Sequence, residues 1–99
     1  MDCDIGGAKM KSIIPQGDTD TCYLCGAWAT DTHHCLHGSY RKKADADGLT
    51  VQLCRHCHTL LHDHGVADKF LQQIAQLSWE QKYGTREEFM KRYGRSFIV

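Results

Sequence analysis

Two Cys-x2-Cys pairs constrain this chain more than any other feature of its sequence. Cys22 and Cys25 form the first pair, Cys54 and Cys57 form the second, and 28 residues separate the two pairs. A two-residue spacer lets one tight turn present two sulfurs to the same ion, and zinc binds four thiolates in a tetrahedron at about 2.3 Å. The two pairs therefore predict one structural Zn²⁺ that closes the intervening chain into a loop.

The size of the chain explains why a metal would help it to fold. The chain has 99 residues, of which 41% are hydrophobic, so we expect one domain with a modest core. Domains of this size often add a metal ion or disulfides to such a core. Residues 1–16 lack the apolar block of a secretory signal, and no apolar run approaches the roughly 18 residues of a membrane-spanning helix. We therefore expect a cytoplasmic protein with no membrane partner, whose cysteines are thiols or metal ligands.

Other interpretations of the cysteines fit the sequence less well. A redox pair usually comes as one motif beside a βαβ unit, and that pattern is absent here. A two-Cys, two-His finger needs about 12 residues between its second Cys and its first His, whereas His33 follows Cys25 after seven. The zinc deaminase signature is absent too, since no His-x-Glu precedes a Pro-Cys-x2-Cys. Of the remaining cysteines, we expect Cys3 to be a free thiol and Cys35 to be a small buried hydrophobe.

Turn residues and apolar positions divide the chain into three parts. Residues 1–20 are rich in turn-forming residues and predict a weakly structured leader, from which Ile13 and Ile14 could pack on the domain as a short arm. Residues 21–65 are expected to form the zinc-stapled core, and residues 66–99 a helical C-terminal extension.

The expected core is a β-hairpin followed by a helix. Residues 27–34 and 49–53 read as extended segments, with a polar, basic loop and a turn between them at 38–48. A helical pattern begins at His58 and reaches a plausible stop at Gly65.

Helical patterns also fill the extension. An apolar stripe at spacings of four, four and three residues predicts one helix, and capping-box patterns at Ser78 and Thr85 predict two short helices that end near Gly84 and Gly94. We expect seven apolar side chains of this region to pack into the core: Val66, Phe70, Ile74, Leu77, Trp79, Phe89 and Tyr93.

Four of the seven histidines are arranged as if for a second metal ion. His33 and His34 are adjacent on an extended segment, where neighbouring side chains point to opposite sides, so one can bind a metal and the other can face a substrate. His58 and His62 are four residues apart on the expected helix and share a face, which is a common way to hold a divalent ion. The zinc would fix the start of that helix and give the four histidines a rigid base. The other three are expected to be surface or packing residues: His37, His56 and His64.

This layout resembles the HNH nucleases of the ββα-metal class. The shared features are a Cys-x2-Cys, a His-His, a basic loop with glycine, and a Cys-x2-Cys-His-x3-His, and they span about residues 22–62. The combination of His-His with His-x3-His is most similar to the nuclease colicins, in which three histidines hold the metal. The resemblance implies a small α+β fold: a ββα-metal, or treble-clef-like, finger with a structural zinc and a C-terminal helical tail.

The resemblance further implies a metal-dependent endonuclease that hydrolyses DNA phosphodiester bonds. His33, His58 and His62 would hold the divalent metal, His34 would be the general base, and we count His33, His34 and His58 as catalytic. Imidazole ligands suit transition ions better than Mg²⁺, so we expect a transition metal in vitro. The candidate ions are Mg²⁺, Mn²⁺, Ni²⁺ and Zn²⁺, and the physiological ion stays open. The family is frequent in phages and mobile elements, and a homodimer would be one way to cut both strands.

One departure from the family concerns the middle Asn. In the family this Asn orients the general-base His through a hydrogen bond in the hairpin, at about the place where this chain has Leu49. No Asn occurs in the sequence. We expect Asp47, or a backbone carbonyl in the 45–48 turn, to take its place. Without a substitute, His34 would be poorly positioned and activity would be weak or absent.

Charge restricts where nucleic acid could bind. The 12 Lys and Arg balance the 12 Asp and Glu, so contacts must come from local basic residues. Expected phosphate contacts are Arg41, Lys42 and Lys43, after the His pair, and Arg55 in the second Cys pair. So few contacts predict weak, salt-sensitive binding that reads sequence poorly.

Two alternatives stay open at this point. The basic residues near the C-terminus could be an ordinary solvated helix face: Arg86, Lys91, Arg92 and Arg95. The whole chain could instead be a non-catalytic zinc module that binds nucleic acid or a protein partner, which the missing Asn and the zero net charge favour.

Overall fold

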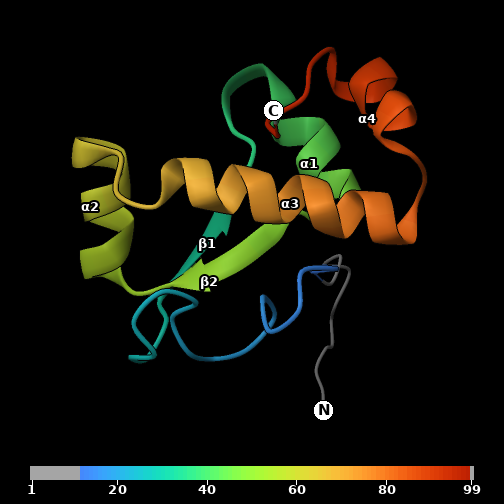
Figure 1. The fold of residues 1–99 in the computed structure, drawn as a ribbon. Coiled ribbons are helices and arrows are strands. Elements are labelled where there is room, and N and C mark those ends of the chain that lie inside the picture. The colour runs from blue at the N-terminus through green and yellow to red at the C-terminus, as the bar shows by residue number, and fades with distance from the viewer. Residues whose placement is uncertain (1–11, 99) are drawn as a thin grey trace.

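The computed structural model describes residues 12–98 as a small α+β fold. Its elements are, in order, β1 (Asp31–His34), the 3-10 turn η1 (Gly38–Tyr40), α1 (Arg41–Asp47), β2 (Thr50–Leu53), α2 (Arg55–His64), α3 (Asp68–Lys82) and α4 (Arg86–Tyr93). In Figure 1, α3 runs between α2 at one end of the molecule and α1 and α4 at the other. Residues 1–11, which include Cys3 and much of the expected leader, lie outside the described part.

The two strands form an antiparallel sheet that positions the histidines. Asp31 pairs with Leu53 and His34 with Thr50, so each residue of β1 lies opposite one residue of β2 and no bulge interrupts the pairing. Side chains alternate along a strand, and Asp31 and His33 accordingly lie on the side of β1 that faces α2. This alternation leaves His33 buried and His34 partly exposed.

The segment before the first Cys pair packs on β2. Ile14 is only 2% exposed and belongs to the core. The Ser12 hydroxyl donates a hydrogen bond to the Thr50 carbonyl at 2.5 Å, and the Ile13 N–H donates to the Gly48 carbonyl at 2.9 Å. The arm considered for Ile13 and Ile14 is therefore present in the described residues.

The predicted loop at 38–48 is wrong, because most of it is helical. The 3-10 turn η1 leads directly into α1, which ends at Gly48 with a left-handed φ of 78°. Favourable helix formers such as Lys42, Lys43 and Ala44 allow this helix, and the buried contacts of Asp47 hold its last turn in place.

The predicted break at Ser78 is also wrong. The helix α3 continues without interruption to Lys82, and Ser78 is buried within it. The second capping box is confirmed: the Thr85 side chain accepts from the Glu88 N–H, the Glu88 carboxylate accepts from the Thr85 N–H, and α4 ends at Gly94. The pattern at Ser78 lies inside α3, whereas the pattern at Thr85 follows the end of α3 and begins α4.

The buried face of α3 differs from the predicted stripe. Val66, Phe70 and Leu77 are 45%, 50% and 43% exposed, and Ile74 is only partly buried. The face that packs is Leu71, Ala75 and Trp79, which also recur every four residues and so form a competing stripe one residue further on. The predicted burial of three residues is confirmed: Trp79, Phe89 and Tyr93.

The carboxylate of Asp47 joins α1 to α3 and α4. The side chain is 12% exposed, and the carboxylate accepts hydrogen bonds from Trp79 Nε1 at 2.9 Å, from the Tyr93 hydroxyl at 2.6 Å and from two nitrogens of Arg92 at 2.6 and 2.9 Å. The expectation that Asp47 orients His34 is therefore wrong, because these donors occupy its carboxylate.

Replacing Asp47 by Ala is expected to lower the free energy of unfolding by about 3 kcal/mol, because it leaves a guanidinium and two buried donors without their acceptor. Urea unfolding of the zinc-loaded protein measures this change. The exposed Asp18→Ala variant is the control, and equal stability of the two variants would contradict the role given to Asp47.

Candidate functional site

The four cysteines of the two pairs meet in one cluster. Their sulfurs all lie within 4.8 Å of one another, and Cys25 Sγ lies 3.7 Å from Cys54 Sγ. Gly26 takes the left-handed φ of 83° that the tight turn after Cys25 requires. Cys54 caps α2, where its sulfur accepts a hydrogen bond from the Cys57 N–H. The group could hold a structural metal such as zinc.

The electrostatics of the cluster favour the thiolate at Cys22 and oppose it at Cys57, where burial and the neighbouring thiols raise the pKa. Burial opposes ionisation of the Cys22 thiol, yet hydrogen bonds from the backbone at Cys54, Cys25 and Leu24 lower its pKa to about 6. Because the thiolate is the form that binds metal, the fold favours the ligand state there. Cys35 is fully buried as predicted, and burial raises the pKa of its thiol to about 12.

Three histidines form a second cluster between β1 and α2. One ring nitrogen each of His33, His58 and His62 lies within 4.8 Å of the others. The ring centroid of His33 is 5.2 Å from that of His58 and 5.6 Å from that of His62. The i, i+4 spacing on α2 therefore produces the shared face expected of it.

The Nε2 atom of His33 is buried and has no hydrogen-bond partner among the described residues. Leaving such a group unsatisfied costs about 1–3 kcal/mol. Burial, and secondarily the neighbouring His58 and His62, lowers the pKa of His33 to about 4, which keeps the imidazole neutral. A neutral, buried nitrogen aimed at two other imidazoles fits a divalent cation.

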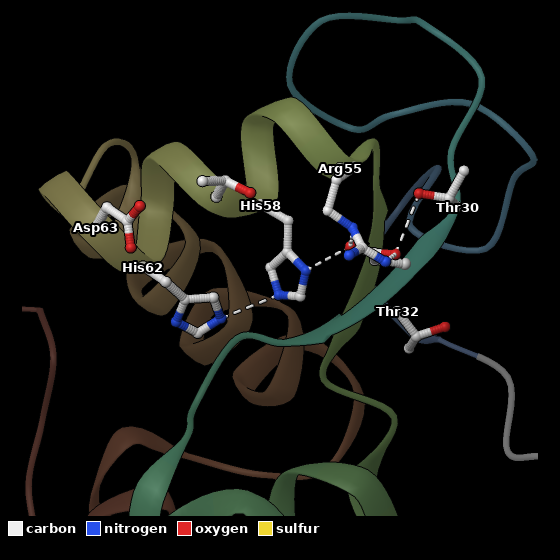
Figure 2. Close-up of a pocket in the computed structure, with 8 residues that line it drawn as sticks. Thr30, Thr32, Arg55, His58, His62 and Asp63 are labelled. Carbon is white, nitrogen blue, oxygen red and sulfur yellow. Dashed lines mark hydrogen bonds and ion pairs between the residues drawn. The ribbon is translucent and has the colours of Figure 1, made fainter.

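The carboxylate of Asp31 orients His58. His58 Nδ1 donates to Asp31 Oδ2 at 2.8 Å, and His58 Nε2 lies 3.0 Å from His62 Nε2. Figure 2 shows the rings of His58 and His62 next to each other. The hydrogen bond to Asp31 leaves the Nε2 lone pair of His58 directed at His62, an arrangement typical of metal-binding histidines. The hydrogen bond from His58, together with Arg55, lowers the pKa of Asp31 to about 2.

His34 lies in the same pocket as the three histidines. The pocket has a volume of about 170 Å³ and is lined by Thr32, His33, His34, His37, Arg41, His58 and His62. The side chain of His34 is 15% exposed, and its Nε2 donates to Asp45 Oδ1 at 3.0 Å. Its Nδ1 atom is the nitrogen left for another partner.

The four predicted phosphate contacts separate into two groups. Arg41 lines the histidine pocket, and Lys42 borders an adjoining cavity with His34 and Arg41. Lys43 points elsewhere, since its Nζ donates to the Arg92 carbonyl at 2.7 Å. Arg55 is paired with Asp31. Arg41 and Lys42 are thus the predicted cations that the structure places beside His34.

Other polar groups at the site were hard to predict from the sequence. His37, expected at the surface or in packing, lines the pocket with its ring 6.1 Å from that of His33, and its Nε2 donates to Asp68 Oδ1 at 3.1 Å. The position of Asp31 could have been predicted, because it lies two residues before His33 and so on the same face of the strand. The contact of Asp45 with His34 could not be predicted, since the segment of Asp45 was expected to be a turn.

Comparisons with protein families, with curated proteins and with solved structures found no match. Within residues 12–98, no helix is long and apolar enough to cross a membrane. The function must therefore be inferred from the residues of the two clusters.

Replacing Cys54 by Ser is expected to remove the zinc and unfold the domain, because it takes away both a ligand and the cap of α2. Zinc content by elemental analysis and thermal unfolding by circular dichroism measure the two effects. Cys35→Ala is the matched control, since Cys35 lies in the core, and it should keep its zinc. A Cys54→Ser protein with full zinc and unchanged stability would contradict the cluster.

Proposed function

We propose that the chain is a metal-dependent endonuclease of the HNH type that hydrolyses DNA phosphodiester bonds. The observation that carries the proposal is the buried, unpartnered Nε2 of His33 beside His58 and His62, in a pocket that also holds His34. A metal ligand set and a separate imidazole base in one pocket are what hydrolysis of a phosphodiester needs.

The scaffold supports this proposal. A hairpin of β1 and β2 is followed by α2, and the cysteine cluster lies where the strand and the helix begin. This order agrees with a ββα-metal finger stapled by a structural Zn²⁺ on its four cysteines. The helix α1 between the two strands is an addition to the expected hairpin.

The residues of the pocket divide the chemistry among them. A divalent ion held by His33, His58 and His62 would polarise the phosphate and stabilise the leaving oxygen. His34 accepts a proton from water at Nδ1 as the water oxygen bonds to phosphorus and the bond to the 3′-oxygen breaks. Arg41, on the same pocket, offsets the negative charge of the phosphate.

A second candidate function is a zinc module that binds a protein or nucleic acid without catalysis. The exposed apolar side chains of Phe70 and Leu77 on α3, and of Val66 just before that helix, favour it, since they leave apolar surface uncovered. The two candidates differ in whether His34 matters to any activity.

Nicking of supercoiled plasmid distinguishes them. The zinc-loaded protein, stripped of its second ion and supplied with Mg²⁺, Mn²⁺, Ni²⁺ or Zn²⁺, should nick the plasmid with at least one ion. His34→Ala should slow nicking by at least about 100-fold while metal binding persists, because only the base is lost.

His64→Ala is the matched control, since His64 is an exposed histidine of α2. Failure of folded wild-type protein to nick with any ion would favour the binding module. Loss of the metal from His34→Ala would instead mean that the roles of His33 and His34 are exchanged.

A further inference from the structure

The last turn of α1 contains two acidic residues that are unfavourable at the end of a helix. It carries Asp45 and Asp47, and the helix has no basic residue in that turn. A carboxylate near a helix C-terminus is unfavourable because of the helix dipole, and Asp is a poor helix former. The buried hydrogen bonds of Asp47 offset this cost. Asp45 is different, because its side chain is 68% exposed.

The described side-chain contact of Asp45 is with His34. Its Oδ1 accepts from His34 Nε2 at 3.0 Å. A neutral imidazole carries one proton, so a proton held on Nε2 leaves Nδ1 as a base. The same hydrogen bond fixes the rotation of the ring. Asp31 likewise accepts a hydrogen bond from one ring nitrogen of His58, Nδ1, and leaves the other free.

The position of Asp45 depends on the C-terminal helices. Asp47, two residues further on, is bound to Trp79 of α3 and to Arg92 and Tyr93 of α4. The Tyr83 hydroxyl also donates to the Asp47 carbonyl at 3.2 Å. These contacts fix the turn of α1 that presents Asp45 to His34.

We propose that Asp45 is a positioning residue for hydrolysis: its carboxylate holds His34 with Nδ1 free to accept a proton, and α3 and α4 fix that carboxylate through Asp47. The inference rests on the proposed function. It gives the helical extension a part in the reaction, although the extension supplies none of the histidines of the metal cluster.

The effects of Asp45 on stability and on DNA binding can be separated from an effect on turnover. Replacing it by Ala removes an acid from a helix C-terminus and adds a better helix former, so stability should hold or rise. Removing a negative charge beside the pocket should also leave DNA binding equal or tighter. A loss of turnover combined with unchanged stability and KM therefore points to positioning.

The test measures kcat and KM for plasmid nicking by the full chain with its activating ion. Asp45→Ala is expected to lower kcat by about 10- to 100-fold, as loss of an orienting partner does elsewhere, with KM equal or lower and the thermal midpoint not reduced. Asp45→Asn should restore most of kcat, because its amide oxygen can accept the same hydrogen bond. Asp18→Ala, an exposed acid elsewhere, is the control for charge.

Three outcomes would overturn the inference: an Asp45→Ala variant with unchanged kcat, a loss of kcat that follows a loss of stability, or an Asp45→Asn variant as slow as Asp45→Ala.

A measurement that does not depend on catalysis separates failure of the positioning role from failure of the proposed function. Long-range ¹H–¹⁵N spectra of the zinc-loaded protein should show His34 protonated at Nε2, and Asp45→Ala should mix its tautomers. No nicking by the wild type contradicts the nuclease, whereas unchanged His34 signals overturn the positioning role.

Discussion

The meeting of the two cysteine pairs is the constraint on which the rest of the structure depends. The first pair precedes β1 and the second begins α2, so one cluster joins the start of the hairpin to the start of the helix. That junction brings His33 on the strand against His58 and His62 on the helix. A chain of 99 residues buries a modest core, and a metal held by four thiolates would stabilise this junction where the core alone is small.

The two clusters were predictable because the spacing of their residues is local. A two-residue spacer within a turn and a four-residue spacing on a helix hold whatever the rest of the chain does. Both clusters are accordingly found where the sequence indicated them. Strand alternation likewise predicted that His33 and His34 would differ, and one is buried whereas the other is partly exposed.

The contacts of Asp45 and Asp47 depend on the tertiary structure and were not predictable. Asp45 and Asp47 lie on α1, which had the composition of a polar loop, and their partners are 11 to 46 residues away. The burial of α3 was mispredicted for a related reason. Two stripes one residue apart fit the helical period, and the indole N–H of Trp79 is satisfied only when its stripe faces Asp47.

Anomalous X-ray diffraction from crystals grown with Zn²⁺ tests the account most directly, since it places each ion without reference to activity. Two peaks per chain are expected, one among the four sulfurs of the cysteine pairs and one among the ring nitrogens of His33, His58 and His62. A single peak at the cysteines, with no ion at the histidines, would contradict the claim that this small scaffold holds a second metal for chemistry.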